Sequence, residues 1–226
     1  MFKDDRRIRM FCGHYGSGKT EFAVNYVTRL KEEVGPDKKV VISDMDIVNP
    51  YFRSRERRTM LEQAGVQLIS SSQACSDADV PSLPAELLAI FENRDIRGIL
   101  DIGGDPVGAR VLARFRPKLL QEDHQLIYVL NANRPEVRDV ESAITYLRGI
   151  EATIGLTCTG IVNNTHLCGE TTAEEIRKGA ALAAAVSRET AIPVLCHVAE
   201  ERFASQLTDL SEPVFPITVK MKKPWE

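Results

Sequence analysis

The segment from Gly13 to Thr20 reads G-H-Y-G-S-G-K-T and directly follows the apolar run from Ile8 to Cys12. It matches G-x-x-x-x-G-K-[ST], the P-loop pattern that binds the phosphates of a nucleotide. Glycines at these positions allow positive φ angles, so that backbone N–H groups can turn inward around a phosphate. The pattern therefore predicts a phosphate-binding loop between a strand and a helix.

Residue types within this segment suit different parts of a nucleotide. Lys19 supplies a positive charge to the β- and γ-phosphates, and the Thr20 hydroxyl can ligate Mg²⁺. Apolar residues recur at helical spacing from Lys19 to about Glu33, and a helix there aims its positive N-terminal end at the phosphates. We expect the nucleotide to contact a continuous set of residues, namely Gly13, Tyr15, Gly16, Ser17, Gly18, Lys19, Thr20 and Glu21.

Two aspartates follow the second predicted strand, residues 39–44. Asp44 and Asp46 stand at i and i+2, so on an extended segment their carboxylates point to the same side. One can orient Mg²⁺ while the other positions the attacking water. The alternative is a pair of solvated turn aspartates. We expect Asp46 to act in catalysis with Lys19 and to lie near the metal.

A third acidic residue ends another apolar strand. Asp101 follows Ile99 and Leu100 and begins D-I-G-G, which fits both a Walker B carboxylate and the D-x-x-G of nucleotide switches. The alternative role for Asp101, capping the next helix, suits Asp105 better because Pro106 follows it. The expected magnesium ligands are therefore Thr20, Asp46 and Asp101.

Asparagines end two further strands, at Asn131–Pro135 and at Gly160–Asn164. An Asn amide both donates and accepts hydrogen bonds, as recognition of adenine or guanine requires. Turn formation is the alternative, since Asn serves it equally well. We expect Asn163 or Asn164 to lie near the base.

Near-continuous apolar strands alternate with helical periodicities along the chain. This pattern is typical of an α/β protein with a doubly wound, mostly parallel sheet in three layers, the P-loop NTPase fold, and it predicts one nucleotide-binding domain over residues 1–226. The expected strands are 8–12, 39–44, 66–69, 98–102, 125–131, 156–163 and 193–197. The expected helices are 19–33, 53–64, 84–93, 107–120, 136–150, 172–189 and 200–207.

Composition narrows the setting and the partners. The formal net charge is −3, so no general attraction to nucleic acid is expected. Five scattered cysteines and the absence of an apolar leader favour a reducing, cytoplasmic setting, and no apolar run of 18 residues predicts a membrane span. The basic run from Arg53 to Arg58 can hold a phosphate or an acidic partner, or it is a solvated helix face.

Four features of the sequence together resemble the MinD/ParA/CobQ-type P-loop ATPases of the SIMIBI class: the P-loop, the D-x-D at Asp44–Asp46, the D-x-G-G at Asp101–Gly104, and Asn163–Asn164. This resemblance implies ATP and Mg²⁺ as cofactors. It implies Asp46 as the water-activating aspartate, Asp101 as the Walker B acid, and Asn163 or Asn164 as a base contact.

The chain departs from that family at one end of the loop. The family's loop usually reads G-K-G-G-x-G-K-[ST], and its extra lysine reaches across a nucleotide-sandwich dimer. Here His14 and Tyr15 replace the lysine and the following glycine. The chain therefore resembles a divergent member, and a homodimer remains one possibility.

The function expected from these patterns is an ATP-binding switch that hydrolyses ATP slowly with Mg²⁺ and acts on an unidentified protein partner. A GTPase is an alternative, although no N-K-x-D follows a strand to read guanine. A P-loop kinase of a small molecule and a nucleotide-sensing adaptor without turnover are further alternatives.

Overall fold

The computed structural model describes residues 6–45, 58–70, 85–104 and 106–220. Asp46, Asp105 and most of the basic run from Arg53 to Arg58 therefore lie outside the described residues. The strands are β1 (Ile8–Cys12), β2 (Lys39–Asp44), β3 (Val66–Ser70), β4 (Ile96–Asp101), β5 (His124–Leu130), β6 (Cys158–Asn163), β7 (Val194–Glu200) and β8 (Val214–Ile217).

The strands form one eight-stranded sheet in the order β3-β2-β4-β1-β5-β6-β7-β8. All of its strand pairs in the described parts of the chain are parallel, where the sequence predicted a mostly parallel sheet. This order places β1 in the interior of the sheet, between β4 and β5. The segment after β1 therefore lies between the carboxyl ends of neighbouring strands, where ligands bind in such sheets.

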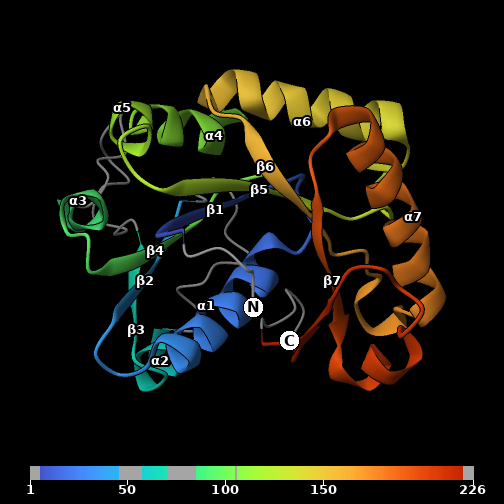
Figure 1. Ribbon diagram of the computed structural model, residues 1–226, viewed down its shortest axis with the longest axis horizontal. Coiled ribbons are helices and arrows are strands. Elements are labelled where there is room, and N and C mark those ends of the chain that lie inside the picture. The colour runs from blue at the N-terminus through green and yellow to red at the C-terminus, as the bar shows by residue number, and fades with distance from the viewer. Residues whose placement is uncertain (1–5, 46–57, 71–84, 105, 221–226) are drawn as a thin grey trace.

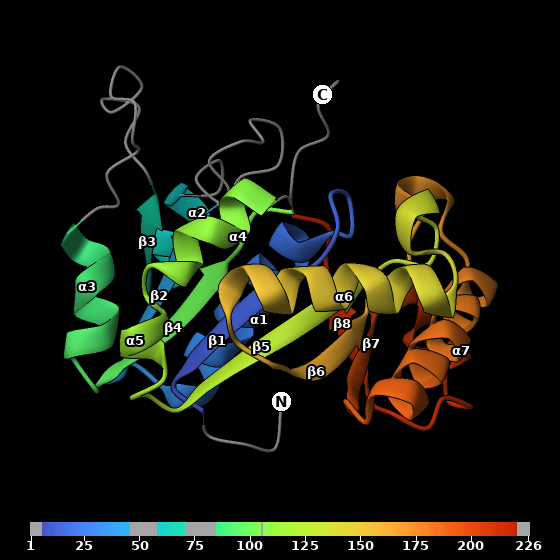
Figure 2. The ribbon, with the colours of Figure 1, turned by 90° about the horizontal axis from the view of Figure 1, so that it is seen from above.

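Helices cover both faces of the sheet, which confirms the three-layer α/β architecture (Figures 1 and 2). One face is covered by α1 (Lys19–Val34) and α2 (Arg58–Gln63). The other is covered by α3 (Ala85–Glu92), α4 (Pro106–Ala113), α5 (Arg116–Leu119), α6 (Val140–Ile154) and α7 (Ala173–Thr190). Short 3₁₀ helices lie at η3 (Pro135–Val137), η4 (Cys168–Glu170) and η5 (Glu201–Gln206).

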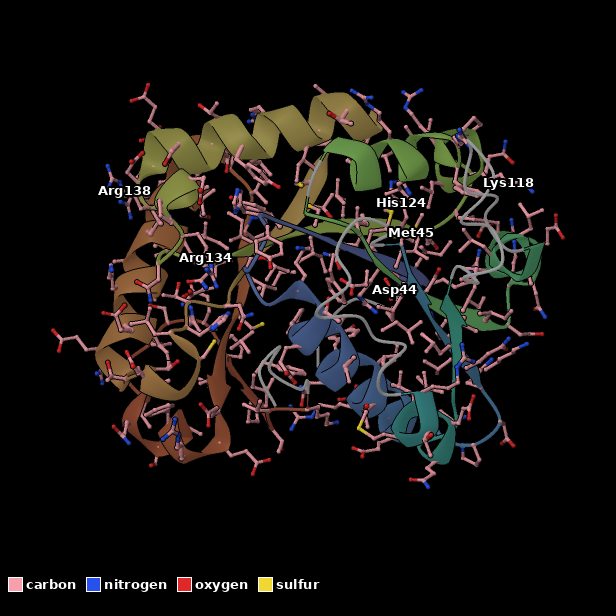
Figure 3. All side chains as sticks on the ribbon, turned by 180° about the vertical axis from the view of Figure 1, so that it is seen from behind. Asp44, Met45, Lys118, His124, Arg134 and Arg138 are labelled. Atoms are coloured by element: carbon pink, nitrogen blue, oxygen red, sulfur yellow. The ribbon has the colours of Figure 1, made fainter. Side chains whose placement is uncertain are left out.

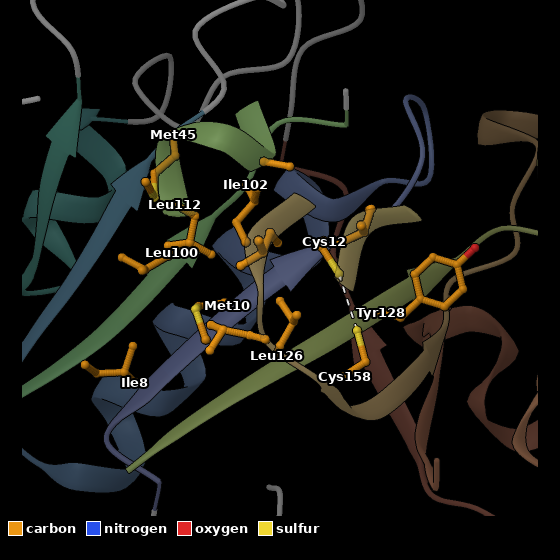
Figure 4. Close-up of a cluster of buried hydrophobic side chains, with 14 of the residues drawn as sticks. Ile8, Met10, Cys12, Met45, Leu100, Ile102, Leu112, Leu126, Tyr128 and Cys158 are labelled. Carbon is orange, nitrogen blue, oxygen red and sulfur yellow. Dashed lines mark hydrogen bonds between the residues drawn. The ribbon is translucent and has the colours of Figure 1, made fainter. Parts of the chain in front are cut away.

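The central strand β1 shows why the strands read as continuous apolar runs. Its residues alternate between the two faces: Met10 and Cys12 join the core beneath α4 and α6, and Phe11 joins the core beneath α1. Phe11 packs edge-on against Phe22 of α1, with ring centroids 4.9 Å apart. Figure 4 shows the first of these cores, in which Cys12 approaches Cys158 of β6.

Two predicted helices have different bounds in the structure. The predicted helix 107–120 is split into α4 and α5 because Pro117, which has no N–H, sits in the first turn of α5. The predicted helix 136–150 begins later, at Val140, because the Asp139 side chain accepts a hydrogen bond from the Ser142 N–H and forms a capping box. It continues to Ile154 and ends at Gly155, which has a φ of 75°.

The C-terminal part also differs from the prediction. Strand β7 continues to Glu200, so the predicted helix 200–207 is reduced to the 3₁₀ helix η5. Val214 to Ile217 form the eighth strand, which pairs with β7 and is an edge strand of the sheet formed by the described residues. Pro216 is tolerated there because an edge strand leaves one row of N–H groups unpaired. No helix within the described ranges is long and apolar enough to span a membrane.

Candidate functional site

The predicted phosphate loop connects β1 to α1. Gly13, Gly16 and Gly18 have φ angles of 150°, 73° and 76°, which a side chain would oppose. The close packing of the loop adds a second reason, because a Cβ on Gly13 would lie 2.3 Å from the carbonyl oxygen of Val129. The glycines of the motif are therefore required by both the turn and its neighbours.

The polar groups of the loop are arranged for an anion. The Ser17 N–H and Lys19 Nζ donate to the carbonyl of His14, at 3.0 and 3.2 Å, so the ammonium folds back over the loop. The Ser17 hydroxyl is buried and has no hydrogen-bond partner in the described parts of the chain. A buried hydroxyl in that state beside a lysine fits a phosphate ligand.

Two carboxylates lie side by side next to this loop. Asp44 ends β2 and Asp101 ends β4, and the two are register partners in adjacent parallel strands. Both are buried, and the Met45 N–H donates to the Asp101 carbonyl at 2.9 Å. The sequence paired Asp44 with Asp46, which lies outside the described residues, and the structure adds Asp101 beside Asp44. Only the register of the sheet reveals this pair.

The ends of β5 and β6 hold the backbone of the loop. Asn131 Nδ2 lies 3.3 Å from the carbonyls of both Gly16 and His166, and Asn164 Nδ2 donates to the Ser17 carbonyl at 2.8 Å. Asn131, one of the asparagines considered for base recognition, is fully buried and instead joins the loop to the segment after β6. These bonds fix the position of the loop relative to β5 and β6.

The two asparagines predicted near the base have different positions. Asn163 does not line the cavity described below, because its amide donates to the Ile176 carbonyl at 3.0 Å and its Oδ1 accepts from Thr165. It also lies 3.2 Å from Nδ1 of His197. Asn164 does line the cavity. Sequence reasoning could not separate these neighbours, since their orientation depends on the end of β6.

A cavity of about 350 Å³ extends from the loop to the ends of β6, β7 and β8, a volume suited to a small molecule. One end, the loop end, is lined by Tyr15, Gly16, Gly18, Lys19, Thr20 and Glu21. The other, the β6–β7 end, is lined by Asn164, Thr165, His166, Cys168, Gly169, Thr171, Ile176, Val198, Ala199, Glu200, Arg202, Ile217 and Val219. Of the predicted contact residues, Gly13 and Ser17 belong to the loop but do not line the cavity.

Arg134 also lines the cavity, and the sequence had not singled it out. Its Nε donates to the Gly16 carbonyl at 2.8 Å. Figure 3 shows Arg134 toward the inside of the molecule, whereas Arg138, four residues later, lies at the rim. The turn after β5 is a common place for an exposed arginine, so nothing in the sequence distinguished this one.

His166 is a second cavity residue that the sequence analysis missed. Burial of its ring and the nearby charge of Arg134 lower its pKa from 6.5 to about 4, so the imidazole is neutral at pH 7. Its Nδ1 accepts a hydrogen bond from the Cys168 N–H at 3.3 Å, which assigns the ring proton to Nε2. Nε2 is buried and has no hydrogen-bond partner within the described residues.

The glycines after Asp101 touch the phosphate loop. A Cβ on Gly104 would lie 2.7 Å from the Tyr15 nitrogen and 3.0 Å from Lys19 Nζ. The Gly104 carbonyl accepts a hydrogen bond at 2.8 Å from the hydroxyl of Tyr146 in α6, whose ring packs edge-on against His14 at 5.2 Å. The end of β4, the loop and α6 are therefore in direct contact.

Comparison with known proteins gives matches only among solved structures. No family model matches the chain, and no curated protein matches it either. The cell division protein FtsY from Thermotoga maritima matches with a TM-score of 0.60 and 20% identity, over 88% of this chain and 63% of that one. The signal recognition particle receptor FtsY from Elizabethkingia anophelis matches with a TM-score of 0.53 and 18% identity, over 93% of this chain and 63% of that one.

A third match is the signal recognition particle 54 kDa protein from Aeropyrum pernix K1 in complex with GDP. Its TM-score is 0.51 and its identity 19%, over 82% of this chain and 40% of that one. The chain has a P-loop NTPase fold. It spans less than two thirds of the length of each of these three chains. At these identities the matches show the fold, and the likeness to MinD/ParA/CobQ-type ATPases stays a prediction.

Proposed function

We propose that this chain binds a nucleoside triphosphate with Mg²⁺ in the Gly13–Thr20 loop and acts as a nucleotide-dependent switch, with residues 1–226 as one nucleotide-binding domain. The observation that carries this proposal is the cavity, which joins the loop to the β6–β7 end. Lys19 and the N-terminus of α1 lie at one end to take phosphates. The other end has room and polar groups for a base.

Guanine nucleotide is the first candidate ligand. Two of the structurally similar proteins, FtsY from Elizabethkingia anophelis and the Aeropyrum pernix protein, were solved in complex with GDP. Asn164 follows β6 and holds the Ser17 carbonyl, which leaves the next residues of the segment facing the cavity. The support for a guanine nucleotide is the similarity of fold to these proteins. We give it more weight than the resemblance in sequence that predicted ATP.

ATP is the second candidate, and one observation favours it. After Asn164 the chain reads Thr165, His166 and Leu167, where the guanine-reading N-K-x-D pattern has a lysine and an aspartate. Leu167 is an exposed apolar residue and supplies no carboxylate for the N1–H and amino group of guanine. Measured base preference decides between these two candidates.

The residues present fit a magnesium ion shared with a nucleotide. Thr20 lies in the first turn of α1, directly after the loop glycines. The buried carboxylates of Asp44 and Asp101 lie beside each other at the ends of β2 and β4. The described residues contain no cluster of three or more His, Cys, Asp or Glu that would hold a metal by itself. That suits Mg²⁺, which is commonly held by one or two protein groups together with phosphate oxygens and water.

Slow hydrolysis coupled to a conformational change completes the proposal. Lys19 would stabilise charge on the transferred phosphoryl group, and Asp46, outside the described residues, would position the attacking water. Gly104 lies against the Tyr15 nitrogen and Lys19 Nζ, so a γ-phosphate held by those groups would meet its backbone. If the phosphate moved Gly104, the hydrogen bond from Tyr146 to Gly104 would transmit that movement to α6. An unidentified protein partner would bind one of the two conformations, and a second copy of the chain is one candidate for this partner.

The test is a thermal-shift series with Mg-GTP and Mg-ATP, followed by measurement of released phosphate. A ligand at 100 times its dissociation constant stabilises the native state by about 2.7 kcal/mol. We expect Mg-GTP to raise the melting temperature more than Mg-ATP. The reverse order would favour the second candidate, and no shift with either would refute nucleotide binding.

Variants at two lysines give this test a control. Lys19→Ala removes the loop ammonium and should weaken nucleotide binding by about 100-fold, as expected for a hydrogen bond to a charged group. Lys38→Ala removes an exposed charge far from the cavity and should bind like the wild type. Equal binding by the two variants would place the nucleotide outside the loop.

A further inference from the structure

Arg134 is a half-buried cation on the wall of the cavity. No carboxylate in the described residues lies within ion-pair distance of it, unlike Arg7, whose guanidinium pairs with Glu122. A guanidinium is always charged and carries five N–H donors, of which one, Nε, is used on the Gly16 carbonyl. The remaining donors are on the terminal nitrogens, beside the phosphate loop.

The position of Arg134 is set by a tight turn after β5. The Arg134 N–H donates to the Asn131 carbonyl at 3.0 Å, and the Asn133 N–H donates to Asn131 Oδ1 at 3.0 Å. Pro135 then begins η3. Because the backbone and Nε are both bonded, the guanidinium is held with little freedom, which lowers the entropy cost of using it on a ligand.

The guanidinium also lies very close to the loop itself. A Cβ on Gly16 would be 2.6 Å from Cζ of Arg134 and 2.7 Å from Nη2. Glycine is required at position 16 for two reasons: its φ is 73°, and a side chain there would collide with the guanidinium. The loop and the arginine are fitted to each other.

The carboxylates on the cavity wall are already occupied. Glu21 accepts hydrogen bonds from Asn25 and from the Lys220 N–H, and Glu200 pairs with Arg202 at 2.9 Å. Neither is within ion-pair distance of Arg134. On the loop side of the wall, Arg134 thus has no ion-pair partner among the described residues, and an anionic ligand there would compensate its charge.

We propose that Arg134 is a second phosphate-binding cation, whose terminal nitrogens donate to the phosphate chain of the nucleotide held by the loop. This inference rests on the proposed function, and it adds to Lys19 a residue from a different strand end. The planar fork of an arginine suits two oxygens of one phosphate group, which a lysine ammonium cannot match.

A purely structural role is the competing explanation, since Arg134 also clamps the Gly16 carbonyl. Asn164 offers a control, because its Nδ2 donates to the neighbouring Ser17 carbonyl at 2.8 Å, carries no charge and makes none of the bonds given above for the turn that holds Arg134. Loss of such a clamp should weaken phosphate-bearing ligands, relative to the wild type, by the same factor at low and high salt. Loss of a charged phosphate contact should weaken them by a factor that decreases in high salt.

The experiment measures the affinity of the full chain for guanosine, GMP, GDP and GTP with Mg²⁺, by competition against a fluorescent nucleotide, at low and high salt. If ATP is the preferred ligand, adenosine, AMP, ADP and ATP replace the guanine compounds. The proteins are the wild type, Arg134→Gln, Arg134→Lys and Asn164→Ala. Circular dichroism and the melting temperature without ligand show that each variant is folded, and Arg134→Lys keeps the test valid if the glutamine variant is not.

We expect Arg134→Gln to weaken triphosphate binding by about 10- to 100-fold at low salt and nucleoside binding by less than twofold, and Arg134→Lys to bind with an affinity between those of Arg134→Gln and the wild type. The loss caused by Arg134→Gln should decrease in high salt, whereas the loss caused by Asn164→Ala should not change with salt. If Arg134→Gln has no effect, or a loss as independent of salt as that of Asn164→Ala, the inference fails while the proposed function stands. If the wild type binds none of these ligands, both fail.

Discussion

At the loop end of the cavity the lining residues come from one stretch, Tyr15 to Glu21, whereas at the β6–β7 end they come mainly from β7, β8 and the segments that follow β6 to β8. The backbone of the loop end is shaped by two glycines with positive φ angles, Gly16 and Gly18. The β6–β7 end consists of side chains such as His166, Glu200 and Val219. Chemistry shared by all nucleotides, the phosphate chain, thus falls on a local motif, and selectivity for a base falls on residues distant in sequence.

The two ends are nevertheless in contact at Gly18. A Cβ on Gly18 would lie 2.4 Å from Nδ2 of Asn164 and 2.9 Å from Nε2 of His166. A change at one end can therefore disturb the other. The following predictions use this contact, beginning with the largest effect.

Gly18→Ala should have the largest effect, lowering the free energy of unfolding by about 3 kcal/mol. It combines a side chain at a φ of 76° with the clash against Asn164. Gly155→Ala, in the same left-handed conformation at a φ of 75° and with only the exposed Arg116 side chain near the new Cβ, should cost about 1 kcal/mol. Denaturant titration measures both. Equal losses would mean that the contact between the ends adds no strain.

A third glycine controls for the general effect of adding a methyl group. Gly149 lies inside α6 with nothing within 4 Å of a new Cβ, so Gly149→Ala should stabilise the chain by about 0.5–1 kcal/mol. A destabilising result there would show that the glycine series measures something other than loop geometry.

The two asparagines at the end of β6 should separate stability from binding. Asn163→Ala removes buried hydrogen bonds to Ile176 and Thr165 and should lower the free energy of unfolding by about 2 kcal/mol. Asn164→Ala removes the bond to the Ser17 carbonyl and should chiefly reduce nucleotide affinity. Denaturant titration and nucleotide titration of both variants test this. The opposite assignment would mean that Asn163 turns toward the cavity when ligand binds.

The smallest expected effect is a pH dependence at the β6–β7 end. Burial lowers the pKa of His166 from its usual 6.5 to about 4 in the folded chain, so the unfolded state binds more protons between these values. The free energy of unfolding should therefore fall as pH decreases from 7 toward 4. His166→Gln should flatten this decline. Denaturation at pH 7 and pH 5 measures it.

His124→Gln is the matched histidine control for that experiment, because His124 begins β5, away from the cavity. In the His124→Gln variant, the free energy of unfolding should still show the decrease between pH 7 and pH 5 that His166 causes. If His166→Gln changes the slope no more than His124→Gln does, the His166 imidazole is not buried as the structure shows.

Much of the fold was predictable because burial leaves a periodic trace in the sequence. Strand β2 and the start of α1 have the predicted bounds, and the apolar runs marked the parallel sheet. Pro117 indicates a helix break and Asp139 a helix start, and both residues are visible in the sequence. The predicted bounds followed the apolar periodicity and did not use these two signals. The strand at Val214–Ile217 was harder to predict, because a four-residue edge strand with a proline has almost no pattern of its own.

The candidate site divides in the same way. The loop residues were identified because a phosphate is bound by backbone geometry, which a short glycine pattern specifies locally. The bond from Asn164 to the loop, the pair formed by Asp44 and Asp101, and the place of Arg134 depend on strand order and register. These are set by packing of the whole sheet, and no local pattern encodes them.

The sequence by itself therefore determined that this chain carries a phosphate loop between a buried strand and a helix, since both are local consequences of residue type and spacing. Only the tertiary structure decided what surrounds that loop. It places Arg134 and His166 on the cavity wall and turns Asn163 away from it, because side chains from separate strands meet only when the sheet has folded.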